Sequence, residues 1–123
     1  MIRGKVNAEL QPLVILDVAG PLTEPVALPL LVDTGFNGHL TLSTNVIVAL
    51  DLDQIGYSDS KLADGSTVRF PAFAAIVNWF DEDRPVTVLQ GDEEALLGMK
   101  LLEGCRLKVE SWSGGAVEIE RTP

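Results

Sequence analysis

The chain is poor in the residues that mark several common classes of protein. It has one cysteine, Cys105, so no disulfide can form within the chain, and nothing in the composition requires an oxidising compartment. Nine lysines and arginines stand against eighteen aspartates and glutamates, which gives a formal net charge of -9 with no basic cluster. Nucleic acids and anionic membrane surfaces both select for concentrated positive charge, so neither is an expected partner.

Long apolar runs are also missing. The segment MIRGKVNAEL at the start lacks the apolar core of a secretory signal peptide, and the longest nearly uncharged apolar stretch, Phe70 to Phe80, is too short to span a bilayer. Hydrophobic residues nevertheless make up 46% of the 123 residues, which is ample for a core. We therefore expect a single domain over residues 1–123 in a soluble, cytoplasmic protein.

The most distinctive stretch is the sequence LLVDTGFNGHLTLS at residues 30–43. Its first three residues are continuously apolar, which is typical of a strand buried on both faces, and the run ends abruptly at Asp33. Gly35 and Gly38 permit positive φ or a close backbone approach, and the alternation from Leu40 onward indicates a second strand. The pattern therefore predicts a carboxylate at a strand-to-turn junction inside a core, where it must be hydrogen-bonded, paired or partly protonated.

At these residues the chain resembles the retroviral-type (retropepsin-like) aspartic proteases. Their signature is two or three apolar residues, then D-T-G, then a turn and another apolar strand, and here it is Leu31 to Gly35. A second family mark, two apolar residues and a glycine opening a short helix, is matched by Leu96 to Gly98 followed by residues 99–102. A glycine-centred hairpin candidate lies between them at residues 63–66. The order and spacing match over most of the chain, and the motif is most similar to small single-domain bacterial members with D-T-G-F-x-G.

The resemblance implies an all-β fold, a small closed β-barrel of the retropepsin-like acid protease type with one short C-terminal helix. It also implies an aspartic endopeptidase in which Asp33 is catalytic, Thr34 braces the paired acids across a two-fold axis, and Gly35 lets the substrate backbone lie close. This chemistry needs two carboxylates that share one proton. Because the chain has one D-T-G, the enzyme would be a homodimer that acts on a polypeptide, without a cofactor or metal.

Five further residues are candidate substrate contacts. Phe36 and Asn37 stand where the retroviral enzymes have a small residue and a second acid, so substrate contacts are where this chain departs from the family. Asp64, Gly65 and Ser66 would form the tip of a flap that folds over the substrate, and the Asp-Gly pair favours a type I′ turn. An exposed hairpin in a binding module or structural barrel would have the same sequence.

Two other functions remain open. A non-catalytic retropepsin-like dimer could bind a peptide or hold an assembly together, and a monomeric β-barrel could bind a small apolar ligand and leave Asp33 unpaired. We favour the enzyme because a pure scaffold has no reason to bury a carboxylate at such a cost. His39 and Cys105 lack the partner acid and local pattern of a cysteine protease. The acidic clusters at residues 81–83 and 92–94 lack the alternating ligands of a calcium loop, so we predict no metal site.

Local periodicity predicts the remaining elements. A first strand over residues 2–10 continues after Pro12, and a turn is expected at residues 81–85. The strands expected from these patterns cover residues 2–10, 13–18, 26–32, 40–43, 55–62, 67–79, 86–89, 105–109 and 116–120.

Two helices are expected. The first covers residues 44–50 with Ser43 or Thr44 as its N-cap, although the β-branched residues there also fit a strand. The second begins at Asp92, with acids in its first turn, and ends near Gly104.

The chain ends are predicted to form the dimer seam. Arg3 and Lys5 lie on one face of the first strand, and Glu118 and Glu120 lie on one face of the last, so the two strands carry complementary charges. Association would then depend on burying their apolar neighbours in a core shared by two subunits. Those neighbours are Ile2, Val6, Val117 and Ile119.

Overall fold

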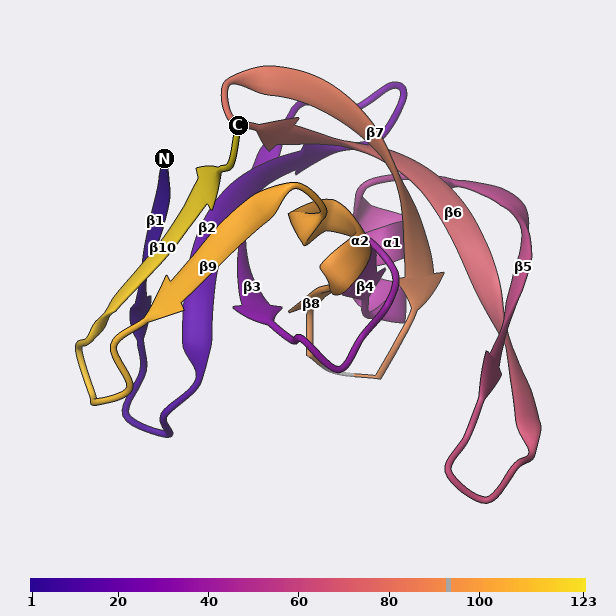
Figure 1. Ribbon diagram of the computed structural model, residues 1–123. Coiled ribbons are helices and arrows are strands. Elements are labelled where there is room, and N and C mark those ends of the chain that lie inside the picture. Colours follow the sequence, from indigo (N-terminus) through magenta and orange to yellow (C-terminus); the bar gives the residue numbers. More distant parts are fainter. Residues whose placement is uncertain (93) are drawn as a thin grey trace.

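The computed structural model describes residues 1–92 and 94–123 and is built almost entirely of strands (Figure 1). The strands are β1 (Ile2–Val6), β2 (Pro12–Ala19), β3 (Val26–Val32), β4 (Leu40–Leu42), β5 (Asp53–Lys61), β6 (Thr67–Trp79), β7 (Glu82–Gln90), β8 (Leu96–Leu97), β9 (Cys105–Val109) and β10 (Ala116–Arg121). The helices are α1 (Thr44–Ala49) and α2 (Met99–Leu102). The structure thus has the expected short C-terminal helix and, in addition, the helix expected after Ser43.

Six of these strands close into a barrel. Within the described residues the strands form one sheet in the order β5-β6-β7-β4-β8-β3-β2-β1-β10-β9. An additional pairing of β6 with β2, at Val18 with Val77 and Ala19 with Ile76, joins the run from β6 to β2 into a ring. The prediction of a small closed β-barrel is confirmed. The β5–β6 hairpin projects beyond the barrel on one side, and β1, β10 and β9 continue the sheet on the other (Figure 1).

The core consists of aliphatic side chains and one buried tryptophan, Trp79, and no polar or charged residue among those described is buried. Val32, the last residue of β3, is only 5% exposed, and the turn that carries Asp33 follows it directly. The core therefore fixes the base of that turn. The largest fully buried side chains are Leu30, Leu40, Leu42, Leu97, Leu101, Ile119, Val14, Val18, Val77, Val88 and Val117.

The predicted first strand over residues 2–10 is confirmed for residues 2–6 and wrong beyond them, because β1 and β2 form a hairpin. The turn is built by Asn7, whose Oδ1 accepts hydrogen bonds from the N–H groups of Glu9 (3.0 Å) and Gln11 (2.9 Å). Leu10 takes a positive φ of 62°. An asparagine side chain that replaces backbone acceptors is a common way to form a turn, and here it acts although the apolar alternation runs on through the turn.

The second predicted turn also differs. Phe80 and Asp81 both have positive φ, 54° and 62°, and they lie between the paired residues Trp79 and Glu82. This is a two-residue hairpin of the type I′ class, so the turn does not extend over residues 81–85. Pro85 lies inside β7, in a part of that strand that β4 does not pair.

The tip of the β5–β6 hairpin is a three-residue loop, not the type I′ turn expected there. Gly65 has a φ of 86°, whereas Asp64 is not among the residues with positive φ. The N–H of Gly65 donates to the carbonyl of Leu62 at 3.0 Å, and the N–H of Leu62 donates to the carbonyl of Ser66 at 2.8 Å. This is the pattern of a loop closed by a glycine bulge. The two long arms are confirmed as β5 and β6.

Both helices are short. Ser43 caps α1, since its hydroxyl accepts a hydrogen bond from the N–H of Val46 at 3.4 Å, as predicted. The helix expected from Asp92 to near Gly104 is present only in its last part, and its predicted start is wrong: Asp92 and Glu94 lie outside any helix, and Glu93 lies outside the described residues. The sheet takes residues 96 and 97 as β8, so the helix can begin only after Gly98. In the described part of the chain no helix is both long and apolar enough to cross a membrane.

The terminal strands close on their own chain. β1 pairs with β10 and β10 pairs with β9, and Arg3 lies opposite Glu118 with a side-chain distance of 3.7 Å. Val6, Val117 and Ile119 are each at most 3% exposed in the core of the same chain. The prediction that these residues form a core shared between two subunits is therefore wrong, because their burial already belongs to the fold of one chain.

Candidate active site

The turn that carries Asp33 rests on β8 and the start of α2. Its backbone is tied to that segment at both ends and in the middle, so the turn and its support form one hydrogen-bonded unit. The four bonds run from the N–H of Asp33 to the carbonyl of Leu97 (2.9 Å), from Gly98 to His39 (2.9 Å), from Met99 to Phe36 (2.7 Å) and from Lys100 to Gly38 (3.2 Å). This confirms the expectation that Leu96 to Gly98 pack beneath the acid-bearing turn.

Gly98 allows this close approach. A Cβ on Gly98 would lie 2.3 Å from the carbonyl oxygen of Gly38 and 2.5 Å from Cδ2 of Phe36. The Phe36 ring also covers Gly38, where a Cβ would lie 2.6 Å from its Cζ. The ring is therefore held against two glycines, so Phe36 supports the turn as well as lining the cleft described below.

The Asp33 carboxyl is oriented but not deeply buried. Its Oδ1 accepts a hydrogen bond from the N–H of Gly35 at 2.8 Å, and Oδ2 has no partner among the described residues. The residue is half-buried, and Thr34 and Gly35 are exposed. The prediction of a carboxylate inside a core is therefore wrong for a single chain, because the turn leaves the core as soon as Val32 ends. One oxygen is free to meet a proton, a water or a second carboxyl.

A cleft of about 740 Å³ connects this turn with the projecting hairpin. Three predicted site residues, Gly35, Phe36 and Asn37, line it on the side of the turn, while the neighbouring Asp33 and Thr34 lie just outside the lining. The arms of the hairpin form the opposite wall. Sequence analysis did not identify these arm residues, although the alternation of Ser58 and Ser60 along β5 could have indicated a shared face. The cleft-lining arm residues are Ser58, Asp59, Ser60, Lys61, Leu62 and Phe70.

The three predicted flap residues gather at the exposed tip of the hairpin and not around Asp33. Asp64 Oδ1 accepts hydrogen bonds from the hydroxyl of Ser66 at 2.6 Å and from its N–H at 2.9 Å. These bonds, led by the one from the hydroxyl, lower the pKa of Asp64 below its usual value. Asp64, Gly65 and Ser66 thus form a self-contained loop at the tip of the hairpin, and none of the three lines the cleft.

His39 lies in the cleft and was not predicted as a site residue. Its Nδ1 accepts a hydrogen bond from the N–H of Thr87 in β7 at 3.0 Å. Burial, together with the positive charges of Arg84 and Lys100, lowers the pKa of the ring. The only signal in the sequence was that the chain's one histidine follows the D-T-G motif by a few residues.

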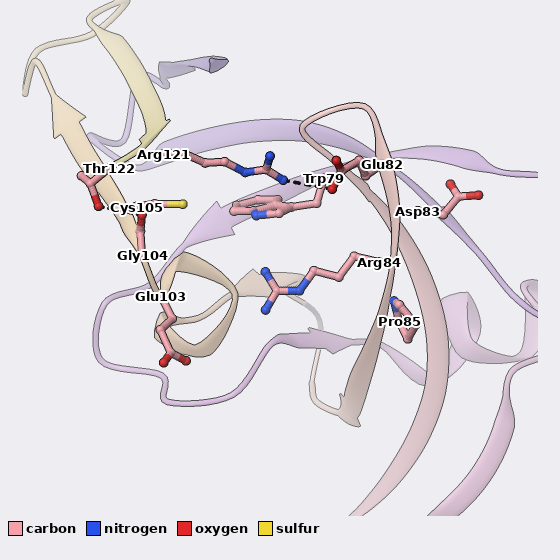
Figure 2. A pocket seen from close by; sticks show the side chains of 10 residues that line it. All are labelled: Trp79, Glu82, Asp83, Arg84, Pro85, Glu103, Gly104, Cys105, Arg121 and Thr122. Atoms are coloured by element: carbon pink, nitrogen blue, oxygen red, sulfur yellow. Dashed lines mark hydrogen bonds and ion pairs between the residues drawn. The ribbon is translucent and has the colours of Figure 1, made fainter.

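A second, smaller cavity of about 300 Å³ contains Cys105, Arg84 and Arg121 (Figure 2). Arg121 pairs with Glu82 at 3.3 Å there. Burial raises the pKa of the Cys105 thiol, which keeps it in the poorly nucleophilic protonated form. His39 lines the other cavity, so the structure does not bring a cysteine and a histidine together. Among the described residues no group of three or more potential metal ligands is found.

Comparison with known proteins finds a likeness in structure and none in sequence. No family model matches the chain, and no curated protein matches it in sequence. Its structure matches the crystal structure of a retropepsin-like aspartic protease from Rickettsia conorii, with a TM-score of 0.52 over 96% of this chain and 94% of that chain. This chain has the retropepsin-like fold. At 15% identity the likeness extends to the retropepsin-like architecture, and the roles of Asp33, Thr34 and Gly35 stay predictions.

Proposed function

We propose that this protein is an aspartic endopeptidase that hydrolyses polypeptides as a homodimer. The observation that carries the proposal is the Asp33 turn. It places a D-T-G carboxylate, with Oδ1 held by Gly35 and Oδ2 unpaired among the described residues, beside a cleft of about 740 Å³ in a retropepsin-like fold. We propose the cytoplasm as its compartment and no cofactor for the reaction.

The mechanism needs a second carboxyl. Two carboxyls held close together share one proton, and aspartic proteases are the established example of such a pair. The ionised carboxyl takes a proton from water, while the protonated one donates a hydrogen bond to the carbonyl of the scissile peptide. One chain offers a single D-T-G turn, so Asp33 of a second copy supplies the other carboxyl. Thr34, which is exposed in the single chain, would brace the two turns against each other.

The cleft suits an extended peptide. It has polar groups from Ser58 and Ser60, apolar surface from Leu62 and Phe70, and the open backbone of Gly35 on the side nearest the acid. Mostly apolar clefts with a few placed polar groups are the usual sites for ligands of this size. A peptide lying between the hairpin and the turn would therefore pass beside Asp33.

The test is digestion of a peptide library at several pH values, with a pepstatin-type inhibitor as the control, together with sedimentation at several protein concentrations. We expect inhibitor-sensitive cleavage with a bell-shaped pH profile on the acidic side of neutral. Activity per chain should rise with concentration as dimers form. If no peptide is cleaved at any pH by protein that sediments as a dimer, the endopeptidase proposal is wrong.

A non-catalytic dimer that binds a peptide or supports an assembly is the second candidate. The half-buried position of Asp33 favours it, because keeping an acid at such a site costs a scaffold less than burying it fully. Peptide binding without cleavage in the same digestion would support this function.

We predict that replacing Gly65 with Val lowers turnover while the fold persists. Gly65 has a φ of 86° with open space around it, so a β-branched residue strains the tip without a steric clash. Gly114→Val is the matched control, since Gly114 has a φ of 85° and equally open surroundings in the β9–β10 connection. Both variants should lose about 1 to 2 kcal/mol of stability. Unchanged hydrolysis by Gly65→Val would remove the flap role from this hairpin.

A further inference from the structure

The side chain of His39 continues the pairing of β4 with β7 toward the Asp33 turn. The two strands pair in parallel over three residues each, and Leu40 with Val88 is the pair nearest the Asp33 turn. One residue before this pair, the Nδ1 of His39, which directly precedes β4, accepts the N–H of Thr87 at 3.0 Å. The imidazole thus takes the place of a backbone carbonyl at the point where the chain leaves the turn.

His39 also connects the turn to the segment that supports it, through its backbone. The carbonyl of His39 accepts the N–H of Gly98 at 2.9 Å, so His39 connects the end of the turn to both the start of α2 and β7. The cleft lies alongside, lined by His39 and Thr87. Breaking this link would therefore change the position of the cleft wall and of the end of the Asp33 turn.

The link depends on the protonation state of the ring. A backbone N–H can only donate, so Nδ1 must be unprotonated and the neutral ring must carry its hydrogen on Nε2. A proton on Nδ1 would place two donors opposite each other and break the bond. Burial and the positive charges of Arg84 from β7 and Lys100 from α2 lower the pKa of the ring. Asp59 and Lys61 of β5, one of each sign, line the same cleft. The neighbouring residues of β4 carry no charge.

We propose that His39 is a positioning residue that clamps the Asp33 turn to β7 through Thr87, and that protonation of its ring releases the clamp. The inference deepens the proposed function, because it gives the acidic side of the activity profile a cause outside the paired carboxyls. The clamp itself can be observed whether or not the protein cleaves peptides.

Nuclear magnetic resonance tests the clamp directly, because the chain has one histidine and its ring signals need no further assignment. On acidification, the Thr87 amide signal should shift with the same midpoint as the His39 ring. His39→Asn is the matched variant, since the Asn carbonyl oxygen can occupy the position of Nδ1 without titrating. In it the Thr87 amide should stay protected with no such shift. His39→Leu removes the acceptor, and the Thr87 amide should exchange roughly five-fold faster at neutral pH.

Stability should follow the same proton with a defined sign. A histidine whose pKa is lowered by folding binds its proton more readily in the unfolded chain. Its contribution is therefore complete above the unfolded value of about 6.5 and is lost as the pH falls from there through the folded value. Over that window the protein should lose stability relative to His39→Asn. Parallel pH dependence of the two proteins in urea unfolding would contradict the proposal.

The catalytic readout separates this inference from the proposed function. If peptides are cleaved, the acidic limb of kcat should move to lower pH in His39→Asn. His39→Leu should lower kcat more than it raises KM at neutral pH, and this difference should shrink on acidification, where the parent loses the same bond. If no cleavage is found, the Thr87 amide still decides the clamp. A Thr87 signal that ignores the ring titration overturns the proposal, and this measurement on the unmodified chain decides it even if His39→Leu fails to fold.

Discussion

Replacing Asp33 with Asn should abolish peptide hydrolysis, lowering kcat/KM by about 10²- to 10⁴-fold. The amide keeps the shape of the side chain, and its oxygen can still accept the N–H of Gly35, which Oδ1 accepts at 2.8 Å. It removes the ionisable group that takes a proton from water. The dimer should persist or tighten, because a charge is lost from the site where two copies would meet. Peptide cleavage and sedimentation of the same preparation measure both effects.

The control for this variant is Asp17→Asn, which makes the same chemical change on the exposed face of β2. It should leave cleavage unchanged. If Asp33→Asn cleaves peptides at a rate close to that of the parent in a preparation free of other proteases, the proposal of an aspartic protease is wrong. If the parent never cleaves and the Asp33→Asn dimer is clearly the more stable one, the non-catalytic dimer becomes the better account.

Replacing Gly98 with Ala should destabilise the protein strongly, because the added methyl group falls where the Asp33 turn is supported. The new Cβ would lie 2.3 Å from the carbonyl oxygen of Gly38 and 2.7 Å from that of Phe36, and backbone atoms cannot move aside by changing a rotamer. We expect a loss of about 3 kcal/mol or more. The turn must shift to relieve the contact, so the folded fraction should also lose activity. Urea unfolding gives the first effect, and cleavage per folded molecule gives the second.

Gly104, at the other end of α2, provides the comparison. It has a φ of 80°, and a Cβ there would meet nothing within 4 Å. Gly104→Ala should therefore cost only the conformational penalty of about 1 to 2 kcal/mol and leave activity per folded molecule intact. Equal stability of the two variants would show that close packing at Gly98 is not what supports the turn.

The parts of the fold that could be predicted are those whose signal is local. The strand ending at Asp33 and the long hairpin around Gly65 are visible as apolar runs and turn residues. The Phe80–Asp81 turn could not be found in this way, because Phe80 is a bulky residue that rarely adopts positive φ, even though aspartate tolerates it. The start of the helix expected from Asp92 was mispredicted for a different reason. Residues 96 and 97 are drawn into the sheet between β3 and β4, and that pairing depends on strands far away in sequence.

In the candidate site, too, only the features with a local sequence signal could be predicted. The D-T-G turn and its glycine support could be predicted because each is a contiguous motif. The exposure of Asp33 could not, since an apolar strand before an acid does not say how soon the chain leaves the core. The bond from Thr87 to His39 joins residues 48 positions apart, and nothing in either segment indicates the other. The cleft walls on β5 depend on the same kind of long-range arrangement.

The closure of β1, β10 and β9 on their own chain has a consequence for control in the cell. A single subunit already pairs its terminal strands with one another, so their pairing does not require a second copy. If each active site needs Asp33 from two copies, abundance itself becomes the regulator. While monomers predominate, halving the amount of protein would reduce the number of active sites roughly four-fold, by mass action. Expression level would then set a threshold below which the cell's other proteins are spared.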